Sequence, residues 1–144
     1  MNIYFCGSIR GGRGLAKTYA KMISMLMTYG KVLTEHLGSD EEIESKDRIM
    51  SDKEIHDRDL QWIVVSDLLV AEVTVPSLGV GYEIGRAIEM GKPVLCLYRS
   101  GSEFTVSAMI AGSDDVEMKY YQNIEEVQGL FEAFFSAHAP HRTS

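Results

Sequence analysis

The chain has 144 residues, a length typical of one domain with a single hydrophobic core. Hydrophobic residues make up 45% of it and charged residues 24%, a balance that excludes wholesale disorder. With 14 Lys and Arg against 21 Asp and Glu, the formal net charge is −7. An acidic chain of this kind is not expected to bind nucleic acid, so any phosphate that it holds must be bound locally.

The two cysteines and the apolar runs bear on the cellular compartment. Cys6 and Cys96 lie inside apolar runs and form no CxxC pair, which is typical of buried thiols in an intracellular protein. No secretory signal is visible, and no apolar run reaches the roughly 18–20 residues that span a bilayer. We therefore expect a cytoplasmic or nuclear protein without a membrane partner. The four histidines and two cysteines lack the spacing of metal ligands, so we expect no metal and no cofactor.

Short apolar runs alternate with segments of helical period along most of the chain. The pattern predicts strands at 3–6, 31–34, 68–71, 94–97 and 118–121. It predicts helices at about 15–30, 52–66, 76–91 and 124–135. The segment 38–53, of mixed charge, is expected to be a solvated loop or a short helix. We treat residues 1–138 as one domain and 139–144 as a flexible tail.

Strands that alternate with helices imply right-handed crossovers and a parallel sheet covered on both faces. The predicted fold is α/β: a single-domain, three-layer α/β/α arrangement with a five-stranded, mainly parallel sheet of the Rossmann or flavodoxin-like kind. In such sheets a ligand binds beyond the carboxyl ends of the strands, at the point where the strand order switches. The unusual residues of this chain follow those ends, at 7–14, 35–36, 72–81 and from Arg99 onward. We therefore expect the functional site at that edge.

A glycine-rich segment, residues 7–14, stands between the first predicted strand and the first predicted helix. Glycines let the backbone approach an anion closely, and a helix N-terminus favours negative charge. Ser8, Arg10 and Arg13 add hydrogen-bond donors. The segment matches neither the Walker A loop nor the dinucleotide-binding pattern. It favours phosphate binding over a plain flexible turn, but does not name the ligand.

A second segment with glycines, residues 76–86, opens a predicted helix. Ser77 has the residue type of an N-cap, which places Glu83 about one and a half turns into the helix, bordering its buried stripe. Gly79 leaves room for a substrate against the carboxylate. The alternative is a surface Glu83 paired with Arg86, and the spacing alone favours neither interpretation.

Asp59 lies in the apolar stripe formed by Ile55, Trp62 and Ile63. Because an unpaired buried charge is costly, this carboxylate should be partnered, protonated or turned toward a ligand cavity. Carboxyl groups with a raised pKa are the usual general acids. A structural hydrogen bond to the backbone or to a buried tyrosine is the alternative. His36, after the second strand, is a weaker candidate for contact with a base or a sugar.

Several blocks of the sequence, in order and at compatible spacing, resemble the 2'-deoxynucleoside 5'-monophosphate N-hydrolases of the nucleoside deoxyribosyltransferase superfamily. The blocks are 4–13, 32–36, 55–56 with 59–60, 71–74, 76–83 with 85–87, and 107–110. The likeness extends from Tyr4 to about Ile110, and it is weak in the segment 38–53 and after Gly112.

The resemblance implies hydrolysis of the N-glycosidic bond of 2'-deoxynucleoside 5'-monophosphates to a free base and 2-deoxyribose 5-phosphate. It implies that Glu83 is the nucleophile and forms a covalent deoxyribosyl-enzyme. It implies that Asp59 is the acid that protonates the departing base and later activates water. It implies that Tyr4 orients the nucleophile. An oxocarbenium-like transition state needs such an anion at C1' and a second, less acidic carboxyl group at the leaving group.

The resemblance also implies a substrate pocket that two subunits share. The residues that correspond to its phosphate and sugar subsites are Gly7, Ser8, Ile9, Arg10, Gly11, Gly12, Arg13 and Ser77. With His36 and Gly79 they form the expected substrate-binding set. Ser107, Ala108 and Met109 correspond to a segment that enters the neighbouring subunit's site, so a homodimer is implied.

Three other functions stay open at this point. A deoxyribosyltransferase would share the glycosyl-enzyme and pass the sugar to a second base, and a ribonucleotide N-hydrolase would use the same chemistry on a different sugar. A nucleotide-binding module without catalysis is a third, because a fold alone does not settle function. The arginines at 10 and 13 favour a nucleotide over a nucleoside. The preferred base is not indicated.

Overall fold

The computed structural model of the chain describes residues 1–9, 15–39, 43 and 49–138. Among these residues, five strands form one sheet in the order β2-β1-β3-β4-β5, and every neighbouring pair is parallel. The strands are β1 (Asn2–Cys6), β2 (Lys31–Val32), β3 (Leu68–Glu72), β4 (Val94–Arg99) and β5 (Glu117–Tyr121). This is the strand order of the flavodoxin-like doubly wound fold, so the predicted fold class is confirmed.

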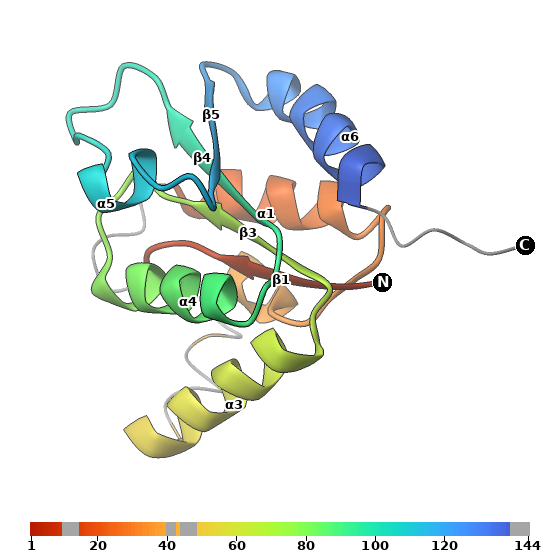
Figure 1. Ribbon diagram of the computed structural model, residues 1–144, viewed down its shortest axis with the longest axis vertical. Helices are drawn as coiled ribbons and strands as arrows, with labels where there is room; N and C mark the ends of the chain where they lie inside the picture. Colours follow the sequence, from red (N-terminus) through yellow and green to blue (C-terminus); the bar gives the residue numbers. More distant parts are fainter. Residues whose placement is uncertain (10–14, 40–42, 44–48, 139–144) are drawn as a thin grey trace, which may run out of the picture.

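Helices cover both faces of the sheet (Figure 1). On one face lie α1 (Ala16–Leu26) and α6 (Val127–His138), and on the other lie α3 (Asp52–Val65) and α4 (Leu78–Glu89). The shorter elements are η1 (Glu35–Gly38), α5 (Ala108–Ala111) and η2 (Ile124–Glu126). None of the helices in the described part of the chain has both the length and the apolar character needed to cross a bilayer. The predicted tail, 139–144, lies outside the described residues.

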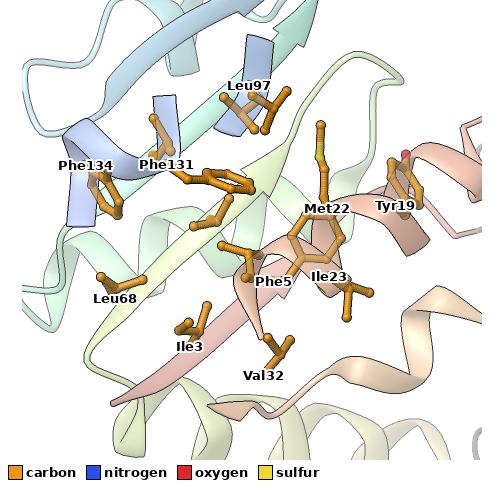
Figure 2. Close-up of a cluster of buried hydrophobic side chains, with 14 of the residues drawn as sticks. Ile3, Phe5, Tyr19, Met22, Ile23, Val32, Leu68, Leu97, Phe131 and Phe134 are labelled. Carbon is orange, nitrogen blue, oxygen red and sulfur yellow. The ribbon is translucent and has the colours of Figure 1, made fainter. Parts of the chain in front are cut away.

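Two hydrophobic layers follow from the alternation of side chains along the strands. In β1, Ile3 and Phe5 face α1 and α6, and Figure 2 shows them in one cluster with side chains from both helices. Tyr4 and Cys6, on the opposite side of the same strand, face α3 and α4. Each large apolar side chain buried in this way contributes about 1.5–3 kcal/mol to stability. The second layer also contains the Tyr4 hydroxyl and the Cys6 thiol, which lie toward the carboxyl end of the sheet.

The starts of α3 and α4 are fixed by their N-cap residues, Ser51 and Ser77. Ser51 and Glu54 form a reciprocal capping box at the start of α3. At α4, the Ser77 side chain accepts a hydrogen bond from the Val80 amide at 3.3 Å, as the N-cap prediction required. Gly91, at φ 74°, follows the last turn of α4, where an αL residue ends a helix most easily.

The second strand is shorter than predicted, because a side chain replaces its last backbone hydrogen bonds. Thr34 Oγ1 accepts from the Phe5 amide at 3.1 Å and donates to the Phe5 carbonyl at 2.6 Å. The strand therefore ends at Val32, and η1 begins at Glu35. The chain turns at this point over the end of β1, which brings His36 toward the site.

Candidate active site

A cavity of about 640 Å³ lies at the carboxyl end of the sheet, where the strand order switches between β1 and β3. The end of β1, η1, α3 and the start of α4 contribute its walls. The residues that both line it and belong to the predicted site are Tyr4, Gly7, Ile9, His36, Asp59, Ser77, Gly79 and Glu83. The topology thus brings together side chains that are up to 79 positions apart, from Tyr4 to Glu83.

Glu83 is the carboxyl group whose protonation is most altered by this environment. Burial raises its pKa from 4.5 to about 7, the negative charge of Asp59 adds to the rise, and hydrogen bonding from Tyr4 and Cys6 opposes it. The group is therefore close to half ionised near neutral pH, so it can serve either as an acid or as a nucleophile. Arg86 does not pair with it, since that guanidinium donates to the Tyr82 hydroxyl at 2.7 Å.

Tyr4 and Cys6 are the hydrogen-bonding neighbours of Glu83 on β1. Burial raises the pKa of the Tyr4 hydroxyl far above its ordinary value, and the charge of Glu83 raises it further. The pKa of the Cys6 thiol is raised by the same two causes, in the same order. Both groups consequently stay protonated and act as donors to the carboxylate, and Cys6 is no thiolate nucleophile.

Asp59 faces the cavity from α3 and has a partner. The Arg58 Nε donates to Asp59 Oδ1 at 2.9 Å, with the Asp59 side chain 20% exposed. The Arg58 guanidinium also stacks over the Trp62 ring, 4.7 Å from its centroid. Of the three outcomes expected for this carboxyl group, two occur together: it is partnered and turned toward the cavity.

The glycine-rich segment is divided between the cavity and the core. Gly7 and Ile9 line the cavity, whereas Ser8 is fully buried and its amide donates to the Tyr19 hydroxyl at 3.2 Å. The predicted binding residues Arg10, Gly11, Gly12 and Arg13 lie outside the described residues. A direct role for Ser8 at the substrate therefore stays a prediction, and its placement points instead to support of the loop.

The segment 107–109 does not reach the cavity of its own chain. Ser107 and Met109 line an adjoining, mainly apolar groove of about 570 Å³, which shares the start of α4 with the cavity. Ala108, the first residue of α5, is exposed. This arrangement leaves the segment free to contact another molecule.

The sequence profile of the family described as Nucleoside 2-deoxyribosyltransferase matches residues 3–130. The chain belongs to this family. A relative from Danio rerio, named 5-hydroxymethyl-dUMP N-hydrolase, is 49% identical over 137 residues, which cover 94% of this chain and 96% of the relative. The Homo sapiens protein of the same name is 44% identical over 141 residues, which cover 96% of this chain and 81% of the relative. The resemblance read from the sequence blocks is confirmed.

Solved structures with this fold share much less sequence. The solution structure of BlsM has a TM-score of 0.70 at 19% identity, covering 99% of this chain and 97% of that one. The structure of the Clostridium botulinum CMP N-glycosidase BcmB has a TM-score of 0.64 at 18% identity, and the match covers 93% of this chain and 99% of that one. At this low identity, the likeness to these two structures supports the fold alone.

The cavity also contains polar residues that were not predicted for this family member. Arg58 pairs with Asp59, and His56 Nε2 lies 2.8 Å from the Tyr82 hydroxyl, a contact that joins α3 to α4. Cys6 was expected to be a buried thiol, with a functional role left open. The period of a strand places it on the same face as Tyr4, so the alternation in β1 contained a signal for its contact with Glu83.

Proposed function

We propose that this family member hydrolyses the N-glycosidic bond of 2'-deoxynucleoside 5'-monophosphates, releasing a free base and 2-deoxyribose 5-phosphate. The observation that carries the proposal is a single cavity lined by Glu83, Asp59 and Tyr4, in which Glu83 has a pKa of about 7. The relatives named 5-hydroxymethyl-dUMP N-hydrolase support both the reaction and the substrate class. Within that class, 5-hydroxymethyl-dUMP is the first substrate to test.

In the first step, the ionised Glu83 attacks C1' of the deoxyribose, and the C1'–N bond breaks with its electron pair leaving on the base. Asp59 protonates the base as it departs, and a glycosyl ester on Glu83 remains. Tyr4, which stays neutral, donates to the Glu83 carboxylate and orients it. The two carboxyl groups share one proton: in the reactive form Asp59 carries it and passes it to the leaving base, while Glu83 is ionised.

In the second step, Asp59 takes a proton from water, and the resulting hydroxide attacks C1' of the ester. The bond from C1' to Glu83 breaks, so that the carboxylate is regenerated and 2-deoxyribose 5-phosphate is released. Two displacements at the same carbon retain its configuration. The phosphate is held away from the reacting bond by the loop that starts at Gly7, with the arginines at 10 and 13 as the proposed charged donors.

We also propose that the protein acts as a homodimer in which residues 107–109 complete the neighbouring site. Leu78 is 97% exposed and Met109 83% exposed beside the apolar groove, an exposure that a second subunit would remove. Mixing two inactive variants tests this: Glu83→Ala and Ser107→Trp together should regain activity, because hybrid dimers contain one intact site. No gain in activity on mixing would refute the shared site.

We place the protein in the cytoplasm or nucleus, since both of its cysteines are buried free thiols.

A panel of deoxynucleoside monophosphates, assayed for released base, tests the reaction itself. Matching nucleosides and ribonucleotides serve as controls for the phosphate and for the 2' position. Release of base from the monophosphates alone supports the proposal, and equal release from the nucleosides would refute it.

Transfer to a second base is the other candidate, because the family's description names deoxyribosyltransferases. A foreign base in the same incubation distinguishes the two functions. A new nucleotide would mean transfer, and reducing sugar without a new nucleotide would mean hydrolysis.

A further inference from the structure

The glycine-rich loop begins on a buried tyrosine of α1. The Ser8 amide donates to the Tyr19 hydroxyl at 3.2 Å, and both residues are almost completely inaccessible to solvent. Gly7 lies against the Tyr19 ring, so that a Cβ at this position would come within 2.8 Å of Cζ. Tyr19 therefore sets both the depth and the direction of the backbone where β1 ends.

Tyr19 is itself held in place by the core around it. Its ring meets the Phe5 ring edge to face, with centroids 6.0 Å apart, and Figure 2 shows it at one edge of the apolar cluster. Behind it, the Tyr121 hydroxyl lies near enough to interact electrostatically with Tyr19 and donates to Glu72. The Glu72 carboxylate also accepts from the Thr74 amide at 2.7 Å and from its hydroxyl at 3.0 Å. These hydrogen bonds join the ends of β3 and β5.

The inward contact of Ser8 has a consequence for its two neighbours. Ser8 is buried with its amide bonded to Tyr19, and Gly7 and Ile9 on either side of it are the described loop residues that line the cavity. Backbone amides bind an anion well only when the chain already has the shape that the anion requires. The Ser8–Tyr19 hydrogen bond is a contact that maintains this shape.

We propose that Tyr19 is a positioning residue for the 5'-phosphate of the substrate, acting through the Ser8 amide and the packing of Gly7. The inference rests on the proposed function, since it takes the backbone of residues 7–9 to belong to the phosphate subsite. Among the described residues, Tyr19 is not part of the cavity lining and is not one of the groups that act on Glu83. Its loss should weaken the binding of phosphate without altering the chemical step.

The test is Tyr19→Phe, which keeps the ring under Gly7 and removes only the hydroxyl. Calorimetric titration with 2-deoxyribose 5-phosphate should show a Kd about fivefold higher, the factor that corresponds to one hydrogen bond of about 1 kcal/mol. The KM for a deoxynucleoside monophosphate should rise by the same factor, while kcat stays within about twofold. The control is Tyr121→Phe, because Tyr121 is equally buried and its hydroxyl donates to Glu72 rather than accepting from the loop. This control should lower the melting temperature and leave Kd unchanged.

Each result has one meaning. An unchanged Kd in Tyr19→Phe, or an equal rise in Tyr121→Phe, would overturn the inference, and so would a fall in kcat at constant Kd. If the wild type binds 2-deoxyribose 5-phosphate but releases no base from any deoxynucleotide, the proposed function fails, whereas the inference about the phosphate subsite still stands or falls on Kd. If the wild type releases base from deoxynucleotides but does not bind the sugar phosphate, the inference is wrong and the proposed function stands.

Discussion

Replacing Glu83 by glutamine should stabilise the folded protein, and the gain should depend on pH. In the folded chain, burial is the main reason that the Glu83 pKa rises from 4.5 to about 7. Below the lower value the carboxyl group is protonated in both the folded and the unfolded chain, so its ionisation costs nothing. As the pH rises from there to about 7, the unfolded chain loses the proton first, and the folded state becomes progressively less stable. Above that range the loss is complete.

The size of the effect follows from the two pKa values. At about 1.4 kcal/mol per pKa unit, a rise from 4.5 to about 7 corresponds to roughly 3 kcal/mol. Glutamine has nearly the same shape and cannot ionise, and its carbonyl can still accept from Tyr4 and Cys6. The stability of Glu83→Gln should therefore exceed that of the wild type by less than about 1 kcal/mol near pH 5 and by roughly 3 kcal/mol near pH 8.

Urea unfolding of both proteins across this pH range measures the difference directly. Glu89→Gln is a matched control, because Glu89 is exposed on the same helix and loses the same charge. This control should run parallel to the wild type at every pH. If Glu83→Gln also runs parallel to the wild type, or if its advantage shrinks as the pH rises, the reasoning about the buried carboxyl group is wrong.

Three other substitutions test neighbouring parts of the account. Asp59→Asn should lower kcat about 10²–10³-fold for an ordinary base and much less for a base that leaves without protonation. Steady-state kinetics with both substrates measure the two losses, and equal losses would refute the acid role. Tyr4→Phe removes a hydrogen bond that lowers the pKa of Glu83, so the rising limb of the kcat/KM profile should move to higher pH, and an unmoved limb would contradict this. Gly7→Ala should destabilise the fold by about 1–3 kcal/mol, since its Cβ would meet Tyr19 at 2.8 Å; an unchanged urea midpoint would count against it.

The sheet and its two helical layers could be predicted because local patterns determine them. Period-two alternation in β1 separates Ile3 and Phe5 from Tyr4 and Cys6, and the helical stripes identify the faces that pack on the sheet. The length of the second strand could not be predicted, since it depends on Thr34 bonding to the backbone of Phe5, 29 positions earlier. Such a contact exists only after the strands have paired.

The site could be predicted in outline and not in its electrostatics. Spacing alone left Glu83 equally suited to a buried position and to a surface pair with Arg86. Only the packing of α4 against the sheet and α3 decides between these. Nothing in the sequence indicated a raised pKa at Glu83, because that shift comes from burial in the folded chain. The pairing of Asp59 with its neighbour Arg58 was likewise not expected. The inward turn of Ser8 depends on Tyr19, and nothing in the local pattern of the loop indicates it.

Trapping the sugar on the protein shows which side chain is the nucleophile. Wild type and Glu83→Gln would each be quenched with acid during turnover of a deoxynucleoside monophosphate and analysed by peptide mass mapping. The account predicts that the wild-type peptide containing Glu83 gains the mass of 2-deoxyribose 5-phosphate less one water, and that the variant gains none. A sugar adduct on another side chain, or base release by the variant at the wild-type rate, would contradict it.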